Sequence, residues 1–253
     1  MVGGAMMSGG GRVAIVTGAA GGIGRVYTRG LAEAGYRVVA ADLRDTVALA
    51  SEVDGEVLAV QVDVRDETST RGMAAAALEA FGQIDVLVNN AAYFSQIVKR
   101  PFDEISVEEW DFAYAVNVRG AWLCARAVLP AMKAQGSGKI INTSSMTFHG
   151  SGIVGFAHYA SSKAAVMALT RCLARELGDL NIAVNTISPD YIEHEGELFR
   201  RQPEMVEVLA RQRAFKRPGT PEDLLGTLLY LAGSGSDFVT GQDIWVNGGR
   251  IFG

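Results

Sequence analysis

Cysteine is scarce in this sequence, with Cys124 and Cys172 the two examples among 253 residues. Both lie in apolar segments that we expect to be helical, so we interpret them as small buried side chains of a reducing compartment, which excludes a disulfide-stapled fold. Long hydrophobic runs are also missing, since no apolar stretch reaches the ~18 residues of a membrane span. The first residues, MVGGAMMSGGG, lack the basic and apolar regions of a secretory signal. We therefore predict a soluble cytoplasmic protein.

An excess of positive charge is absent too, because the formal net charge is −5. This balance argues against nucleic acid or a membrane surface as a partner. The three histidines, His149, His158 and His194, lack the spacing with cysteines or carboxylates that is typical of zinc sites. Apolar residues are plentiful at 49%, which suits a single large domain over 12–253 after a disordered leader, 1–11.

Apolar, β-branched runs alternate with helical patterns along the chain. This order predicts an α/β fold with one doubly wound, Rossmann-type parallel sheet of about seven strands and helices on both faces. The expected strands are 13–17, 37–42, 57–64, 84–92, 138–145, 181–189 and 243–249, and the expected helices include 66–81, 105–134, 158–178 and 221–232.

A glycine-rich turn joins the first expected strand to the first expected helix. Gly18 allows a tight turn, Gly22 lets the backbone approach a pyrophosphate, and Gly24 permits close packing of helix on strand. Their spacing is Gly-x-x-x-Gly-x-Gly, and a glycine cluster can also be a plain turn. The strand–turn–helix context makes this segment a candidate phosphate-binding loop.

Asp42 ends the second expected strand. A carboxylate there can accept hydrogen bonds from an adenosine ribose diol and would repel a 2′-phosphate, which favours NAD over NADP. Arg44 points the other way, because a nearby arginine can receive a 2′-phosphate. Asp42 can also be read as the N-cap of the helix that follows.

Tyr159 and Lys163 stand four residues apart in a segment expected to be helical, so both side chains emerge on one face. A cation close to a phenol lowers the tyrosine pKa towards the range of a general acid or base. The same spacing also occurs on ordinary solvated helix faces. Ser144 and Ser145 end the fifth expected strand, where a hydroxyl would face this helix across the mouth of the sheet.

Three asparagines stand where polar side chains need an explanation. Asn89 and Asn90 lie at the carboxyl end of the fourth expected strand, where open α/β sheets bind ligands, although adjacent asparagines also cap loops. Asn117 lies in an otherwise apolar helical stretch, so it needs hydrogen-bond partners in a structural contact or a polar relay.

Seven motifs stand in the order and spacing of the short-chain dehydrogenase/reductase family: TGAAGGIG (17–24), Asp42, Asp63-Val64, NNAA (89–92), Asn117, Ser145 and YASSK (159–163). The chain resembles this family from about Arg12 to Gly249. The resemblance implies an NAD-dependent oxidoreductase that acts on a secondary alcohol or ketone. The cofactor-binding residues that it implies are Gly18, Gly22, Ile23, Gly24, Asp42, Asp63, Val64, Asn90, Tyr159, Lys163, Pro189 and Ile192.

The resemblance also implies catalytic roles. Tyr159 would donate or accept the proton, and Ser145 would hold the substrate oxygen. Lys163 would lower the Tyr159 pKa and hold the nicotinamide ribose, while Asn117 would anchor a proton-relay water. Ser145 is preferred to Ser144 because the second serine of IINTSS aligns with the family's strand.

The chain departs from the family after its sixth expected strand. Asp190 and His194 stand where the family usually has glycine and threonine, so the threonine contact with the cofactor is in doubt. Asp190 would either contact the substrate or cap the next helix. The resemblance implies that a helical insertion at about 190–218 covers the substrate.

Aromatic residues and long helices suggest two further features. Phe148, Phe156, Tyr191 and Phe199 are either an apolar, aromatic substrate pocket or ordinary core. The family resemblance implies association, often as a homotetramer, through 105–134 and 158–178.

Two alternative functions remain beside the NAD-dependent dehydrogenase. A catalytically silent NAD-binding regulator or scaffold is disfavoured because fold stability does not demand Ser145, Tyr159, Lys163 and Asn117 together. An NADP-dependent 3-oxoacyl reductase is disfavoured by Asp42.

Overall fold

One sheet of seven parallel strands forms the centre of the computed structural model, which describes residues 11–149, 154–193 and 203–252. The order across the sheet is β3-β2-β1-β4-β5-β6-β7, which confirms the predicted parallel α/β architecture. The strands are β1 (Val13–Thr17), β2 (Arg37–Asp42), β3 (Val57–Gln61), β4 (Val86–Asn89), β5 (Gly138–Thr143), β6 (Ile182–Pro189) and β7 (Asp243–Val246).

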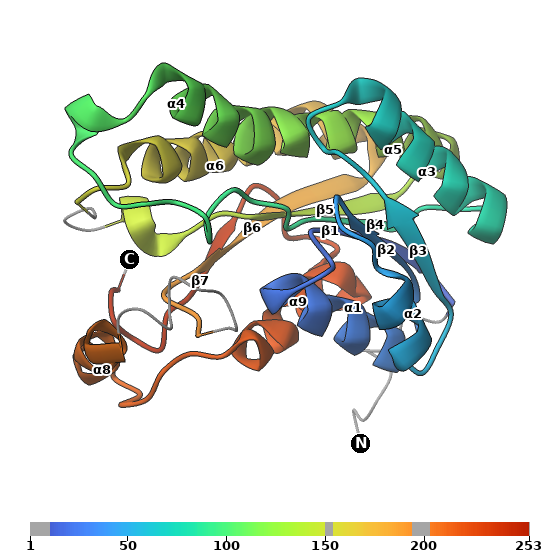
Figure 1. Cartoon of the computed structure of the whole chain (residues 1–253). Helices are drawn as coiled ribbons and strands as arrows, with labels where there is room; N and C mark the ends of the chain where they lie inside the picture. Colours follow the sequence, from blue (N-terminus) through green and yellow to red (C-terminus); the bar gives the residue numbers. More distant parts are fainter. Residues whose placement is uncertain (1–10, 150–153, 194–202, 253) are drawn as a thin grey trace.

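Helices cover both faces of the sheet (Figure 1). One face carries α1 (Gly22–Glu33), α2 (Val47–Glu52) and α9 (Leu225–Ala232), and the other carries α3 (Glu67–Phe81), α4 (Val107–Tyr114), α5 (Gly120–Gln135) and α6 (Ala157–Leu177). The short helix α8 (Pro203–Gln212) lies at the margin, near the C-terminus.

Two apolar cores lie on opposite sides of the sheet. Tyr27 and Leu31 of α1 pack with Leu228 of α9 in one core, and Cys124 and Met132 of α5 belong to the other. Strands β1, β4 and β6 are buried along their whole length. Strands covered on both faces read as continuous apolar runs, which is why the sequence pattern located them.

Several elements end earlier than the sequence predicts. Strands β3 and β4 stop at Gln61 and Asn89, each at the last residue that pairs with a neighbouring strand. The predicted helix 105–134 is interrupted by a π-helical turn over Ala115–Arg119. Residues 213–218 are not helical, and Pro218 disfavours helical backbone in the residue before it.

Cys124 is buried, but the prediction that Cys172 is buried is wrong, because Cys172 is exposed. Thr170 and Ala174 of α6 face the core, and a residue two positions from each points away from it. In the described ranges every helix is too short or too polar to cross a bilayer. The leader predicted at 1–11 falls almost wholly outside the described residues.

The strand order reverses between β1 and β4. In open α/β sheets the crevice beyond the carboxyl ends of the strands at such a switch point is the usual ligand site. Gly18, Asn90, Ser145 and Asp190 follow the carboxyl ends of β1, β4, β5 and β6. The topology therefore brings the predicted site residues to one edge.

Candidate active site

The glycine turn after β1 has the geometry of an anion cradle. Gly18 has a φ of +69°, and a Cβ on it would lie 2.8 Å from Ala91 Cα, while a Cβ on Gly24 would lie 2.0 Å from the Gly18 carbonyl oxygen. Helix α1 begins at this turn with no side-chain cap on Gly21 and no acidic residue in its first turn. Its first N–H groups are thus available to an anion, and the helix dipole favours one there. The turn fits a pyrophosphate.

Asn90 supports the glycine turn from β4. Its side-chain amide donates to the carbonyl oxygens of Thr17 at 3.1 Å and Gly18 at 3.3 Å. Asn89 instead donates to Asn142 Oδ1 at 2.8 Å and so joins β4 to β5. Only Asn90 of the two adjoins the candidate cofactor loop.

Asp42 is buried and is bound to the same turn. Its carboxylate accepts hydrogen bonds from the backbone N–H groups of Ala20 and Arg44, both at 2.9 Å. Thr46 is the N-cap of α2, so the interpretation of Asp42 as that cap is wrong. Arg44 Nη2 lies 3.1 Å from where a Cβ on Gly21 would stand. A carboxylate and a guanidinium therefore share the rim of the turn.

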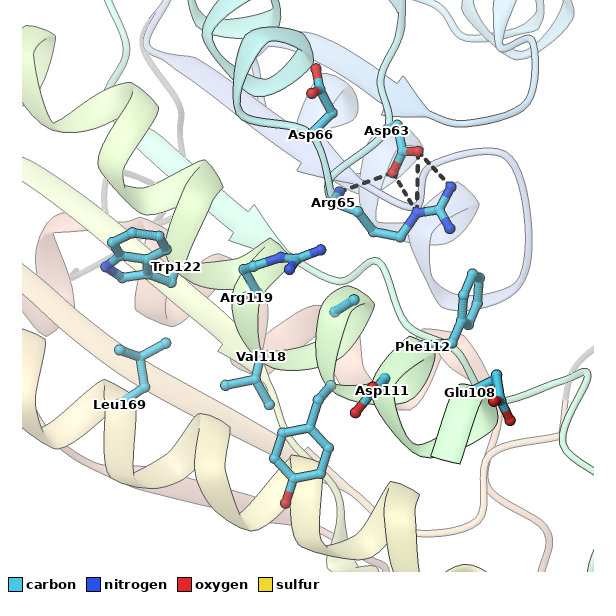
Figure 2. A pocket seen from close by; sticks show the side chains of 12 residues that line it. Asp63, Arg65, Asp66, Glu108, Asp111, Phe112, Val118, Arg119, Trp122 and Leu169 are labelled. Carbon is cyan, nitrogen blue, oxygen red and sulfur yellow. Dashed lines mark hydrogen bonds and ion pairs between the residues drawn. The ribbon is translucent and has the colours of Figure 1, made fainter. Parts of the chain in front are cut away.

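Asp63 has a partner that the sequence analysis did not identify. Arg65 holds its carboxylate through Nη2 at 2.6 Å and Nε at 2.9 Å (Figure 2). This hydrogen bonding holds the pKa of Asp63 below its usual value. Arg65 also lies over the Phe112 ring, 4.8 Å from its centroid, on the wall of a cavity of about 840 Å³. A cofactor contact of Asp63 would have to share the carboxylate with Arg65.

Ser145, Tyr159 and Lys163 meet between the end of β5 and helix α6. Tyr159 and Lys163 are both buried, and the Ser145 side chain lies within reach of a hydrogen bond to Tyr159, which lowers the tyrosine pKa. Lys163 Nζ lies 5.8 Å from the centroid of the Tyr159 ring and donates to the Thr143 carbonyl oxygen at 2.7 Å. Ser144 Oγ donates to the backbone carbonyl of Lys163 at 2.8 Å, which leaves Ser145 as the serine that faces the tyrosine.

Burial dominates the electrostatics of this group. It raises the pKa of Tyr159 to about 12, with the Ser145 hydrogen bond acting in the opposite direction, and it lowers the pKa of Lys163 to about 8. Lys163 is not among the causes of this shift, so its lowering of the Tyr159 pKa stays a prediction. Desolvation favours the neutral form of both side chains, and the Lys163 ammonium is directed to the Thr143 carbonyl.

Asn117 has the partners that a buried asparagine needs. It lies in the π-helical turn, accepts from the Tyr93 N–H at 2.8 Å and donates to Ser162 Oγ at 2.8 Å. Ser162 Oγ in turn donates to the Tyr159 carbonyl oxygen at 2.7 Å. Asn117 thus connects the segment after β4 to α6 at the level of Tyr159. π-Helical turns inside α-helices are frequent at functional sites.

A small polar cavity lies beneath Lys163. It has a volume of about 10 Å³, and its walls include Asn89, Asn117 and Thr143. Within the described chain, Asn89 Oδ1 and Thr143 Oγ1 are buried without a hydrogen-bond partner. A polar cavity of about 10–15 Å³ has room for one water molecule.

Asp190 has ion-pair partners that neither of the roles considered from the sequence includes. Its carboxylate, with a side chain 5% exposed, binds Arg213 Nη2 at 3.0 Å and Arg250 Nη2 at 2.8 Å. The arginines are 23 and 60 residues away in sequence, so local spacing gave no signal of them. His194 and Phe199 lie outside the described residues.

Aromatic side chains surround Tyr159, but they are not the set expected from the sequence. Phe156 lies 6.5 Å from the Tyr159 ring, and Phe94, which the sequence analysis missed, lies 4.7 Å from it. Phe148 packs on His149 instead, with 4.0 Å between ring centroids. Phe94 follows Asn90 by four residues, so its place on the loop after β4 was the available signal.

The remaining predicted cofactor residues lie along the same edge. Ile23 is in the first turn of α1, Val64 follows β3, and Pro189 ends β6. Ile192 is buried and forms a bridge with Gly219. By topology, these residues therefore lie at the same edge of the sheet as the glycine turn.

Comparison with known proteins gives matches over nearly the whole chain. A family model described as Enoyl-(Acyl carrier protein) reductase matches residues 18–250. An uncharacterized oxidoreductase of Schizosaccharomyces pombe is 36% identical, over 96% of this chain and 92% of that protein. An NADPH-dependent aldehyde reductase-like protein, chloroplastic, of Arabidopsis thaliana is 37% identical, over 95% and 94%. A solved short-chain type dehydrogenase/reductase of Mycobacterium marinum has a TM-score of 0.89 and 35% identity, over 98% of each chain.

Proposed function

This chain belongs to the short-chain dehydrogenase/reductase family of oxidoreductases, and on that premise we propose that it transfers a hydride between NAD(H) and a secondary alcohol or ketone. One observation carries the proposal: Tyr159 and Lys163 are buried together on one face of α6, within reach of Ser145, at the sheet edge that also carries the glycine turn. This arrangement supports a site in which proton-transfer groups stand beside a cradle that fits a pyrophosphate.

The chain's own residues would bind the cofactor along that edge. The glycine turn and the first amides of α1 would hold the pyrophosphate, and Asp42 would accept from the adenosine ribose hydroxyls. Lys163 would reach the nicotinamide ribose, and the Ile192 backbone would meet the carboxamide. The cradle at Gly18 and Gly24, which a Cβ would fill, supports this fit.

Proton transfer is assigned to Tyr159. In alcohol oxidation, Tyr159 would first release its own proton to the Lys163 relay, so that the phenolate Oη can take the hydroxyl proton while Ser145 donates a hydrogen bond to the oxygen as charge develops on it. Bound NAD supplies the two-electron acceptor for the hydrogen that leaves the carbinol carbon, so that the alcohol becomes a ketone. In ketone reduction Tyr159 returns the proton, and its raised pKa suits it as the donor at neutral pH.

A relay would connect Tyr159 to solvent through Lys163 and a water held near Asn117. The polar cavity beside Lys163, with its two unpaired acceptor atoms among the described residues, supports this step. The low pKa of Lys163, about 8, supports a side chain that can exchange a proton near neutral pH.

The choice of NAD over NADP rests on Asp42, whose carboxylate disfavours a 2′-phosphate. Arg44 at the same rim favours one, and the Arabidopsis relative is named for NADPH. We retain NAD because Asp42 is buried against the loop, whereas the Arg44 side chain is 70% exposed. The NADP-dependent 3-oxoacyl reductase is the second candidate, favoured by Arg44.

The proposal also covers the class of substrate, the oligomeric state and the cellular location of the protein. Phe94 and Phe156 beside Tyr159 support an alcohol or ketone with an apolar or aromatic flank. Exposed Trp110 and Trp122 support a homo-oligomer, in the family's manner a tetramer. Free cysteines in the described chain suit the cytoplasm.

The test is absorbance of reduced nicotinamide with NAD, and separately NADP, across aliphatic, aromatic, steroid and sugar secondary alcohols. Tyr159→Phe should lower kcat by about 10²–10⁴, the range of general acid–base catalysis. Cofactor titration separates the alternatives if no alcohol reacts. Tight NAD binding without turnover of any alcohol would favour the silent regulator, and absent binding would refute the glycine-turn assignment.

A further inference from the structure

The carboxylate of Glu109, on α4, faces both the loop after β4 and the start of α6. Its side chain is 14% exposed, and its Oε2 forms an ion pair with Arg100 Nε at 3.5 Å, while its Oε1 lies 3.5 Å from His158 Nε2. The Tyr93 side chain lies within reach of a hydrogen bond to the same carboxylate, and burial together with this charge raises the pKa of Tyr93. One largely buried carboxylate therefore joins α4 to two other segments.

The direction of the Glu109 side chain is not the one that its local sequence predicts. Ser106 is the N-cap of α4, and its Oγ accepts from the Glu109 N–H at 3.1 Å. Residues 106–109 have the pattern of a capping box, in which the glutamate side chain turns back to the N-cap. In the structure it is turned to Arg100 and His158. Tertiary contacts therefore determine where this carboxylate lies.

The loop segment 93–100 covers the side chain to which proton transfer is assigned. Its Phe94 ring lies 4.7 Å from the ring of Tyr159, and its Ile97 shares a buried cluster with that tyrosine. The Ile97 N–H closes a turn on the Phe94 carbonyl oxygen at 3.0 Å. The two loop residues that face the carboxylate are the first and the last of this segment. The side chains that cover Tyr159 therefore lie between two anchors.

The first turn of α6 meets the same carboxylate. His158 directly precedes Tyr159 and is fully buried, and both of its ring nitrogens lack a hydrogen-bond partner among the described residues. Burial lowers the pKa of His158, so its ring is neutral at pH 7. Phe156, two residues earlier, lies 6.1 Å from the Phe94 ring. Glu109 therefore contacts both sides of the junction between the loop and the tyrosine helix.

We propose that Glu109 is a positioning residue of the reaction: it holds 93–100 against the first turn of α6, so that Phe94 covers Tyr159 and keeps water from it. The inference rests on the proposed function and deepens it. Glu109 acts through Phe94 rather than on the substrate. A covered phenol is desolvated, which raises its pKa and suits it as a proton donor. Loss of the carboxylate should therefore let water reach Tyr159.

The pH profile of kcat for alcohol oxidation tests this role. In Glu109→Ala the pH of half-maximal kcat should fall by about one unit, because water admitted to Tyr159 favours the phenolate. Glu109→Gln loses the charge but keeps an acceptor for the loop, so its profile should stay close to that of the wild type. Ser145 and Lys163, the polar groups beside Tyr159, are the same in both variants. Equal shifts in Glu109→Ala and Glu109→Gln would show that charge alone is responsible and would overturn the inference.

Glu108→Ala is the matched control. It removes the neighbouring carboxylate from the same turn of α4, where Glu108 is exposed on the wall of the cavity in Figure 2. The pH profile of this variant should match the wild type. A shift as large as that of Glu109→Ala would overturn the inference, because it would arise from the charge of the helix terminus.

A double-mutant cycle tests whether Glu109 acts through Phe94. Glu109→Ala and Phe94→Ala should each lower kcat about tenfold, and the double variant should lose little more than either alone, because both changes remove the same cover. Losses that multiply in the double variant would show that the two residues act independently, which would overturn the inference.

Hydrogen exchange measures the same contact without turnover. In Glu109→Ala the amides of 93–100 should exchange faster than in the wild type, those of α5 should not, and Glu108→Ala should match the wild type. Unchanged exchange in 93–100 would overturn the inference even if alcohols are oxidised. Faster exchange throughout the chain would also overturn it, by indicating a general structural role. Faster exchange confined to this segment, with no alcohol oxidised, would count against the proposed function alone.

Discussion

Lys163 shows at the scale of one residue how a functional group can oppose stability. Burial lowers its pKa from 10.5 to about 8, a difference worth about 3 kcal/mol. Replacing it with methionine removes that cost and forfeits one hydrogen bond to Thr143, worth about 1 kcal/mol. We therefore expect Lys163→Met to abolish activity and to raise the free energy of unfolding at pH 7 by about 2 kcal/mol. Urea unfolding measures this.

The pH dependence of that gain has a definite sign. Between pH 8 and 10.5 the unfolded chain holds the Lys163 proton and the folded chain does not, so wild-type stability rises with pH. The advantage of Lys163→Met should therefore shrink over this window. Lys133→Met, at an exposed position, is the matched control and should change stability little. A gain for Lys163→Met that did not vary with pH would contradict burial of the cation.

Asp42 and Arg44 make cofactor choice a test of two single residues. Asp42→Ala should raise the ratio of kcat/KM for NADP to that for NAD by about tenfold or more, because it removes a repulsion that costs about 1–2 kcal/mol. Asp42 also holds the Ala20 N–H, so Asp42→Asn is the control that keeps an acceptor for the loop.

Arg44 is expected to attract the 2′-phosphate of NADP once the repulsion from Asp42 is removed. Adding Arg44→Ala to Asp42→Ala should reverse most of the gain for NADP, since the guanidinium at the rim would be gone. Initial rates with both cofactors measure each ratio. If NAD preference is the same in Asp42→Ala as in the wild type, Asp42 does not select the cofactor.

Asp190 connects elements rather than catalysing a step. It joins the end of β6 to Arg213, which follows α8, and to Arg250 near the C-terminus. Asp190→Ala would leave two buried or largely buried cations without their counter-charge. We expect a loss of about 3–5 kcal/mol in the free energy of unfolding, measured by urea denaturation.

The exposed pair of Glu207 and Arg211 on α8 provides the control for Asp190. Its side chains are 73% and 80% exposed, so Glu207→Ala should cost less than about 0.5 kcal/mol. Comparable losses in Asp190→Ala and Glu207→Ala would show that the Asp190 cluster does not hold these elements together.

At the scale of the whole molecule, we expect the chain to associate with copies of itself. Trp110 and Trp122 lie on the helical face of α4 and α5 and are 39% and 42% exposed, and Trp122 also lines the cavity of Figure 2. Large aromatic side chains on one face are typical of an interface. We expect size-exclusion chromatography with light scattering to give a multiple of 26.9 kDa.

Two charge insertions locate the interface. Trp122→Glu should move the mass towards the monomer, because it buries a charge in an apolar contact. Val47→Glu, on α2 at the opposite face of the sheet (Figure 1), should not. A monomeric wild type would contradict the expected association, and an unchanged Trp122→Glu oligomer would exclude this face.

The sequence by itself predicted the parallel sheet, the succession of strands and helices, and the grouping of Gly18, Asn90, Ser145 and Tyr159 at one edge. These features follow from local periodicity and from topology, in which the carboxyl ends of parallel strands share an edge. Periodicity did not reveal the π-helical turn at Asn117, because an apolar helical pattern continues through it.

Only the tertiary structure decided the partners of the charged and polar groups. Asp190 finds Arg250 across 60 residues and Asp243 finds His149 across 94, distances over which residue spacing carries no information. Desolvation likewise belongs to the folded molecule, which is why the Tyr159 pKa rises where the Tyr–Lys spacing alone predicted a fall. Periodic burial is encoded locally, whereas charge pairing and dielectric environment depend on which distant segments meet.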